Sequence, residues 1–504
     1  MFRSFVITSA LLLAPSAGLS QVPPANPANS APAPALTVLQ PQEARQDFDL
    51  LRRSLEEGHP GLYRYSTKAD LDREFDALRA RIESPISTAD FEAIVAEALT
   101  GIRCGHTSLT PDPQLESAMR SARTFPLRVV VQGSGLVVML NDTPSNAAIV
   151  PGMQLLEING RKVTDILERF WPCLSADGDI QTGKRHDITG RFAHYYWWLI
   201  DRTDHFTIKA RSDSGAIVSA TLDGVTDADR KTNQNPVNTR VVAAVGKLLR
   251  WGHGDPAFRF IDDPDIAELR LNYFLGNSFP ADLESAFKTL REKKTRALII
   301  DLRGNGGGAD EYGALLVSYL TDKRFRYFDQ IRIKTLEPSF SAQMDGFNSL
   351  KDKLATGQVT RDPGGDFVST PKLHPGLSTQ QPSKSPFTGK VFVLTDGGTF
   401  STAADFCAVL HSLGRATFIG EETGGAYHGN NSGPMPTLTL PHSKAGIRFP
   451  MYAYYNAVPA NQFQRRGTIP DHPVEMKISD LMNGIDAPLD RAVELSRKAT
   501  ASGR

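Results

Sequence analysis

Two strand–turn–helix units predict an α/β fold with a mostly parallel sheet in the C-terminal half of the chain. In the first unit, the strand pattern 297–302 ends in a glycine-rich turn, and a helical pattern follows over 312–320. In the second, the run 391–394 of β-branched and aromatic residues ends in a polar turn. A helix-compatible run over 403–410 and another apolar run over 416–419 come next. Short apolar runs bounded by turns are typical of strands that are buried in a parallel sheet.

This α/β domain is expected to span residues 258–500. A strand pattern over 266–271 and helical patterns over 281–291 and 488–498 belong to it. The segment 339–385 interrupts it with irregular sequence rich in Gly, Pro and Ser. Because long stretches without regular structure are uncommon inside a compact domain, we expect a surface insertion there, which could act as a flap.

The N-terminal half predicts two smaller domains. Amphipathic helical patterns predict a helical domain over 42–124, and its first helix is expected to stop at the Gly-His-Pro-Gly turn 58–61. Short strand patterns separated by turns predict a β-rich domain over 125–225. The residues between this domain and the α/β domain, 226–257, are expected to form a linker.

The first residues carry the pattern of an export signal. Arg3 precedes the apolar run 6–14, and a small-residue cleavage pattern ends at Ser20. The apolar run is too short to cross a bilayer, and no later segment is long and apolar enough. We therefore expect a signal peptide over 1–20 and a disordered Pro- and Ala-rich linker over 21–41. The chain is then exported, periplasmic or secreted, with no stable membrane span.

Composition and charge argue against several classes of protein. The chain has 56 Lys and Arg and 56 Asp and Glu, so its net charge is zero, which argues against nucleic-acid binding by bulk charge. The three cysteines, Cys104, Cys173 and Cys407, form no disulfide framework, and we expect them to be buried and reduced. No Cys or His pair has the spacing of zinc ligands, so we expect no metal and no cofactor.

Ser401 is the first candidate for chemistry. It follows the strand pattern 391–394 and precedes a helix, and open α/β sheets keep their active sites at the carboxyl ends of strands. On the local pattern alone, an ordinary helix N-cap is the simpler interpretation. The pattern also departs from the nucleophile elbow, because Thr399 and Ala403 occupy the glycine positions of that motif.

Two further features could assist a nucleophile. The glycine-rich turn 304–308 exposes backbone N–H groups that could receive an anion, either a phosphate or the oxyanion of a reacting carbonyl. The turn lacks the dinucleotide fingerprint and the P-loop lysine. His106 follows a glycine and precedes a short strand pattern, but a lone histidine is more often structural than catalytic.

Several motifs resemble, in order, those of the tail-specific (C-terminal-processing) serine peptidases. The motifs are Cys104–Thr107, Asp301–Gly308, Thr395–Phe406, Ile419–Gly425 and Gly467–Asp471. The resemblance covers about residues 42–480. It implies a ClpP/crotonase-like α/β domain in an exported serine endopeptidase that hydrolyses peptides or unfolded proteins.

The run 151–163 in the β-rich domain resembles the core of a PDZ domain. PDZ domains bind an extended peptide by strand addition. Two interpretations stay open, a peptide-binding groove and a PDZ-like spacer without one, because a fold alone does not establish a function.

The family has two catalytic designs, and the sequence distinguishes between them. One branch pairs its serine with a lysine, but at the family's interval from Ser401 this chain has Ala426, and a methyl group cannot accept a proton. The other branch, which includes the tricorn core peptidase, uses a histidine from the N-terminal part, and His106 stands at the matching place. The resemblance thus implies Ser401 as nucleophile and His106 as general base and then acid.

The resemblance also implies the groups that would assist this pair. N–H groups of Gly306 or Gly307 and of Thr402 would form the oxyanion hole. In the His branch a glutamate three residues before the closing Gly-x-x-Pro-Asp motif orients the histidine, and Gln464 occupies that position here. A neutral amide would stabilise an imidazolium less than a carboxylate does.

Two alternatives stay open on this sequence. Another acid, Glu421 or Asp471, could orient His106 in place of Gln464. A weakened orienting residue would also fit an inactive binding or carrier protein on the same fold, as in the interphotoreceptor retinoid-binding proteins, although the intact Ser401 and His106 argue against it. The expected partner is a peptide or protein substrate, and the oligomeric state is open.

Overall fold

The computed structural model describes residues 36–232, 235–248, 256–262 and 264–501. The expected signal peptide, and the linker as far as residue 35, lie outside the described residues. The linker prediction extends to residue 41, but β1 (Val38–Leu39) already pairs with β2 (Ile86–Ser87). Among the described helices, none has both the length and the apolar composition of a membrane span.

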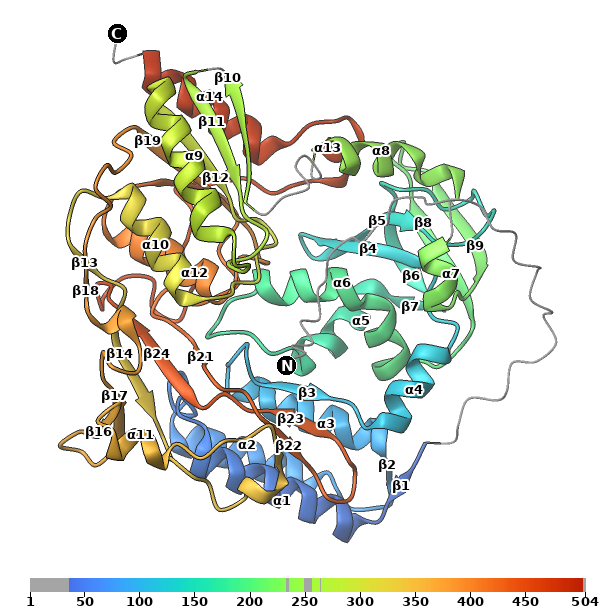
Figure 1. Cartoon of the computed structure of the whole chain (residues 1–504). Coiled ribbons are helices and arrows are strands. Elements are labelled where there is room, and N and C mark those ends of the chain that lie inside the picture. The colour runs from blue at the N-terminus through green and yellow to red at the C-terminus, as the bar shows by residue number, and fades with distance from the viewer. Residues whose placement is uncertain (1–35, 233–234, 249–255, 263, 502–504) are drawn as a thin grey trace, which may run out of the picture.

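A six-stranded sheet forms the centre of the C-terminal domain (Figure 1). Every neighbouring pair is parallel except β10 and β11, which confirms the prediction of a mostly parallel sheet. The strands, in spatial order, are β10 (Ala257–Asp262), β11 (Ile266–Arg270), β12 (Ala297–Asp301), β19 (Lys390–Thr395), β20 (Thr417–Gly420) and β25 (His472–Pro473).

Helices cover both faces of this sheet (Figure 1). Alternate side chains of a strand point to opposite faces, and Leu298 and Ile300 of β12 join one core while Ala297 and Ile299 join the other. The first face is covered by α9 (Phe279–Lys293), α10 (Asp310–Leu320) and α12 (Thr402–Ser412), and the second by α14 (Ala487–Ala501).

The N-terminal helices share the main core of the α/β domain. They are α1 (Pro41–Gly58), α2 (Lys68–Ala80) and α3 (Thr88–Gly101). Their buried side chains, including Phe48 and Phe91, belong to the same hydrophobic cluster as Ile300. The strand after His106, β3 (Ser108–Thr110), also pairs with a late strand, β23 (Gly446–Arg448). The expected helical domain therefore does not pack as a separate unit.

The β-rich region folds as an antiparallel sheet with a core of its own. Its strands are β4 (Leu127–Gln132), β5 (Gly135–Asn141), β6 (Gln154–Ile158), β7 (Arg161–Lys162), β8 (His205–Arg211) and β9 (Ile217–Asp223). The prediction of strands alone was incomplete, because α5 (Val163–Phe170) and α6 (Thr182–Leu199) lie between β7 and β8. Phe192 and Tyr196 of α6 pack against Phe125 in that core.

Two segments expected to lack regular structure contain short elements. The linker prediction for 226–257 is wrong where α7 (Asp227–Thr232) and α8 (Thr239–Leu248) form. Within the expected insertion, Ser339 donates its N–H and its hydroxyl to the Glu57 carboxylate of α1. The short elements there are β15 (Met344–Asp345), α11 (Lys351–Ala355), β16 (Val359–Arg361), β17 (Phe367–Ser369) and β18 (Thr379–Gln380).

The remaining helices and strands lie outside these two segments. They are α4 (Pro113–Ser121), β13 (Phe325–Arg326), β14 (Phe328–Ile333), β21 (Asn431–Ser432), β22 (Thr437–Thr439), β24 (Tyr452–Asn456) and α13 (Ile478–Met482).

Cys104, Cys173 and Cys407 are buried and unpaired, as predicted. Burial raises the pKa of all three thiols. Thiols rather than thiolates are therefore expected at neutral pH, and thiols are poor nucleophiles.

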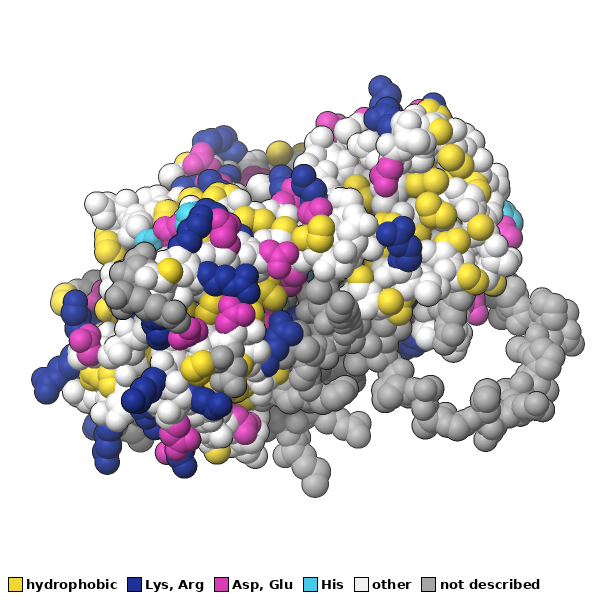
Figure 2. All heavy atoms as spheres, turned by 90° about the horizontal axis from the view of Figure 1, so that it is seen from above, with side chains coloured by type: hydrophobic (Ala, Val, Ile, Leu, Met, Phe, Trp, Pro, Cys, Tyr) yellow, Lys and Arg dark blue, Asp and Glu magenta, His cyan; other side chains and the backbone are white. Residues whose placement is uncertain are grey.

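The surface carries charges of both signs. Figure 2 shows Lys and Arg side chains mixed with Asp and Glu side chains over the face drawn there. This face has no extended field of one sign, which nucleic-acid binding by bulk charge would need.

Candidate active site

Ser401 lies at the start of α12 with a backbone conformation that is rare outside glycine. Its φ is 52° and its ψ is −131°, and such residues persist only where their surroundings hold them. It occupies the N-cap position, but its side chain accepts no capping hydrogen bond from the helix. The interpretation of Ser401 as an ordinary cap is therefore wrong, and its Oγ is available to another partner.

That partner is His106. Nε2 of His106 lies 3.2 Å from Oγ of Ser401, although the two residues are 295 positions apart in the sequence. The His106 ring stacks on the ring of Phe400, with centroids 4.5 Å apart. Phe400 directly precedes Ser401, so an aromatic contact holds the imidazole beside the hydroxyl.

The His106 imidazole is neutral at neutral pH. Burial lowers the pKa of His106 to about 3, and the positive charge of Arg448 adds to the shift. A neutral ring can accept the Ser401 proton at Nε2 only when Nδ1 carries the ring proton. Nδ1 is buried and has no hydrogen-bond partner among the residues that the structure describes. The ring is thus unprotonated and can accept a proton, but its lowered pKa makes it a weaker base, and no carboxylate among the described residues hydrogen-bonds to it.

A second buried histidine, His59, supports the segment after His106. His59 is 1% exposed. Its Nδ1 accepts the N–H of Gly61 at 3.2 Å, so Nε2 carries the ring proton and donates to Oγ1 of Thr107 at 2.9 Å. Burial lowers the pKa of His59 to about 3. If Nδ1 of His59 were protonated, its N–H would face the N–H of Gly61, so this hydrogen bond would be lost and two donors would point at each other.

Acid should destabilise the protein through His59, and His59→Gln should remove this contribution. A histidine with a lowered pKa binds its proton in the unfolded chain first, so its contribution to stability is complete above pH 6.5 and falls as the pH falls toward 3. Between pH 6.5 and 5 the wild type should lose about 2 kcal/mol more of its unfolding free energy than the variant does. Urea unfolding at both pH values measures the difference.

His205→Gln is the matched control, because the His205 side chain is 70% exposed. This variant should keep the pH dependence of the wild type. Equal losses for the wild type and His59→Gln would show that His59 is not the group that titrates.

Gly307 packs directly against Ser401. A Cβ on Gly307 would lie 2.6 Å from Cβ of Ser401 and 2.9 Å from N of Thr402, and its φ is +98°. The N–H of Gly307 already donates to Oδ1 of Asn305 at 2.9 Å. The N–H groups of Gly306 and Thr402 have no acceptor in the described part of the chain. Of the two glycines predicted as donors, Gly306 is the one with a free N–H.

Asp396 connects the glycine-rich turn to the loop that carries Ser401. Its Oδ1 accepts the N–H of Gly304 at 2.8 Å and the N–H of Gly398 at 2.9 Å. The carbonyl oxygen of Asn305 accepts the N–H of Phe400 at 2.9 Å. These bonds fix the turn relative to the serine, as an oxyanion hole requires.

Gln464 makes no hydrogen bond to His106 in the described part of the chain, so its predicted role as the orienting residue has no support in these contacts. Its side chain is exposed, and Nε2 donates to the carbonyl oxygen of Ala460. The residues on either side, Phe463 and Arg465, have φ angles of 45° and 60°. The chain therefore turns sharply at this point, and a count of residues does not predict where the side chain points.

The two alternative acids also bond elsewhere. Oδ2 of Asp471 accepts the N–H of Phe418 at 2.8 Å. Burial raises the pKa of Glu421 to about 7, and the nearby charge of Asp396 adds to the shift. The described contacts join neither acid to His106.

Asp177, which no sequence motif indicates, is a buried carboxylate that connects the two halves of the site. It is 1% exposed, and its Oδ1 accepts the N–H of Gly105, the residue before His106, at 2.8 Å. Its Oδ2 accepts the N–H of Ala426 at 3.4 Å. Burial raises the pKa of Asp177 to about 6. Its only mark in the sequence is an Asp-Gly-Asp stretch, which is typical of an ordinary turn.

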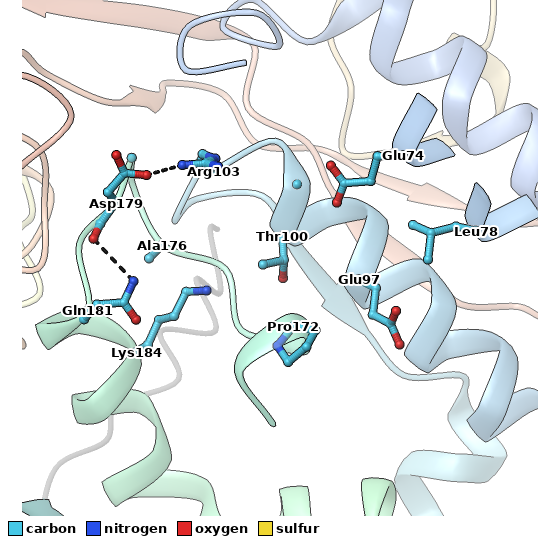
Figure 3. A pocket seen from close by; sticks show the side chains of 12 residues that line it. Glu74, Leu78, Glu97, Thr100, Arg103, Pro172, Ala176, Asp179, Gln181 and Lys184 are labelled. Atoms are coloured by element: carbon cyan, nitrogen blue, oxygen red, sulfur yellow. Dashed lines mark hydrogen bonds and ion pairs between the residues drawn. The ribbon is translucent and has the colours of Figure 1, made fainter. Parts of the chain in front are cut away.

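A polar cavity of about 330 Å³ lies beside the same loop (Figure 3). Its walls come from α2, α3 and the segment 172–184. Arg103 and Asp179 form an ion pair at its edge, which ties the turn before His106 to the loop of Asp177. Ser401 is not among the lining residues, so the cavity is separate from the nucleophile.

Comparisons with known proteins bear on the family and the fold. Residues 265–474 match peptidase family S41. The crystal structure of mature CPAF has a TM-score of 0.60 at 15% identity, over 90% of this chain and 96% of that chain. Mature CPAF complexed with lactacystin has a TM-score of 0.61 at 14% identity, over 90% and 98%. No curated protein matches the chain significantly. At these identities, the structural likeness concerns the fold.

Proposed function

The chain belongs to peptidase family S41 through residues 265–474, and we propose that this serine-type peptidase uses Ser401 as nucleophile and His106 as base. The observation that carries the proposal is the distance of 3.2 Å between Oγ of Ser401 and Nε2 of His106. A hydroxyl within hydrogen-bonding reach of a neutral imidazole is the arrangement that activates a serine. The substrates would be peptides or unfolded proteins, because an extended chain must enter the site.

In the first half of the proposed reaction, Oγ of Ser401 attacks the carbonyl carbon of the scissile bond while Nε2 of His106 takes its proton. The carbonyl oxygen becomes an oxyanion that the N–H groups of Gly306 and Thr402 stabilise. His106 then gives the proton to the leaving amine, and an acyl-enzyme remains.

In the second half, His106 takes a proton from water, which attacks the acyl carbon. The tetrahedral intermediate collapses when His106 returns the proton to Ser401 Oγ, and the free carboxylic acid leaves. A single imidazole thus serves as base and acid in both halves.

We assign to Asp177 the positioning of His106, a role that the sequence had suggested for Gln464. The Asp177 carboxylate holds the N–H groups of Gly105 and Ala426. It would act through the backbone of the turn, because its described hydrogen bonds go to backbone N–H groups and not to the imidazole ring.

The proposal includes export and a peptide-binding role for the β-rich region. The signal pattern over 1–20 supports export to the periplasm or the medium. The run 151–163 supports strand addition of an extended peptide in the manner of a PDZ domain. Fluorescence anisotropy of a labelled peptide with the Ser401→Ala chain measures this binding without cleavage.

A serine-directed fluorophosphonate tests the proposed nucleophile. The mature protein, recovered from outside the cytoplasm, should take up one label on the peptide that contains Ser401 and should lack residues 1–20. Mass spectrometry identifies both. Ser401→Ala should take up no label, because an ordinary serine hydroxyl is too weak a nucleophile to react.

Ser412→Ala is the matched control, since Ser412 lies at the other end of the same helix and its Oγ donates to the carbonyl oxygen of Val409. It should be labelled like the wild type. A wild-type protein that resists the reagent would instead favour a carrier on the same fold.

A further inference from the structure

The free edge of β3 lies next to Ser401 and His106. β3 begins two residues after His106 and is the last strand of the sheet β15-β22-β23-β3. In the described part of the chain it forms a strand pair with β23 alone. The backbone groups on its other side have no strand partner there, which is what strand addition by an extended peptide requires.

Arg448 lies on β23, one strand inside this edge. It lies directly opposite Ser108 in the pairing of β23 with β3, and opposite residues share one face of a sheet. Ser108 is small, so the Arg448 side chain can extend over it toward the free edge. Neighbouring strands lie about 4.8 Å apart, so a strand added to β3 would lie about 10 Å from β23. An extended arginine and an acidic side chain together cover about that distance.

The Arg448 guanidinium lacks a partner in the described part of the chain. The residue is exposed overall, but partial burial lowers the pKa of its guanidinium, and its positive charge acts on His106. That effect lowers the pKa of His106, after the larger effect of burial. During the proposed reaction His106 must become an imidazolium, and an unbalanced positive charge nearby opposes this. A carboxylate brought by the substrate would balance it.

We propose that Arg448 makes this peptidase prefer substrates with Asp or Glu at the residue that pairs with Ser108 on the free edge of β3. An arginine binds a carboxylate through two parallel hydrogen bonds, which gives the selection its geometry. Because Ser108 is two residues from His106, the selected position lies within a few residues of the scissile bond. The inference rests on the proposed function, since it names the substrate class of the same site.

A panel of fluorogenic peptides tests the preference. The peptides have one length and amidated ends, and each position in turn carries Ala, Glu or Lys. In the wild type, Glu at one position should raise kcat/KM about threefold to tenfold over Ala. Arg448→Ala should remove this ratio, Arg448→Glu should shift the preference to Lys, and Arg448→Lys should keep part of it.

Lys444→Ala is the matched control, because Lys444 is an exposed cation in the turn between β22 and β23. It should keep the wild-type ratio between Glu and Ala peptides. An acidic preference that survives in Arg448→Ala would overturn the proposal, as would a wild type that cleaves the Ala and Glu peptides equally at every position.

Two further arms separate the possible causes. Peptides with a free C-terminus test the main-chain carboxylate, and a preference that follows this end and not the Glu side chain would overturn the assignment. The panel is also titrated into the Ser401→Ala chain by anisotropy. Tighter binding of the Glu peptide, lost on adding Arg448→Ala, would support the proposal even if no peptide were cleaved, in which case only the proposed hydrolysis would fail.

Discussion

Replacing His106 with Ala is expected to lower kcat/KM on the order of 10⁴-fold. The neutral imidazole 3.2 Å from Oγ of Ser401 is the only base that the described residues bring to the hydroxyl. Without it, the serine must lose its proton to water as it attacks. Initial rates with a cleaved fluorogenic peptide measure the loss, and unchanged thermal unfolding of the variant shows that the fold is intact.

A double-mutant cycle makes this test sharper. Ser401→Ala should lose as much activity as His106→Ala, and the double variant should lose no more than either, because the two groups act as a unit. His411→Ala is the matched control, since His411 is a half-buried histidine on α12 that contacts Tyr427 and not Ser401. Losses that add in the double variant would contradict a shared mechanism.

Gly307→Ala should inactivate and destabilise the enzyme although it removes no polar group. The new Cβ would lie 2.6 Å from Cβ of Ser401 and 2.9 Å from the carbonyl oxygen of Phe400. The φ of +98° adds backbone strain for any residue with a side chain. Since both contacts involve the loop that holds the nucleophile, we expect a loss of about 10³-fold in kcat/KM and about 2–4 kcal/mol in unfolding free energy.

Gly306→Ala is the control for stability. A Cβ on Gly306 would meet no heavy atom within 4 Å, and its φ is not positive. Urea unfolding should therefore show a near-wild-type unfolding free energy for Gly306→Ala and a lowered one for Gly307→Ala. A Gly307→Ala protein with wild-type stability would mean that the loop yields to the methyl group, and the strain argument would fail.

The parallel sheet was predictable because its central strands are buried on both faces. Runs such as 297–300 and 391–394 are apolar at every position, and such short runs between turns favour buried strands over helices. The β-rich region was harder to predict. Its helix α6 buries aromatic side chains such as Phe192 and Tyr196 against strands, and this packing leaves no periodic pattern in the sequence.

The proximity of Ser401 and His106 was predictable through motifs, and Nε2 of His106 lies 3.2 Å from Oγ of Ser401. Asp177 was not predictable, because its partners Gly105 and Ala426 are 72 and 249 positions away in the sequence. The orientation of the Gln464 side chain could not be predicted by counting residues, because its neighbours Phe463 and Arg465 have positive φ angles. The spacing of motifs in the sequence predicts neither long-range contacts nor local positive φ angles.

The loop around Asp177 also bears on the chain while it is still being made. It bonds to Gly105 and to Ala426, which leave the ribosome far apart in time. During synthesis the chain therefore contains His106 long before it contains Ser401. The proposed pair of Ser401 and His106 can therefore form only once most of the chain has been translated.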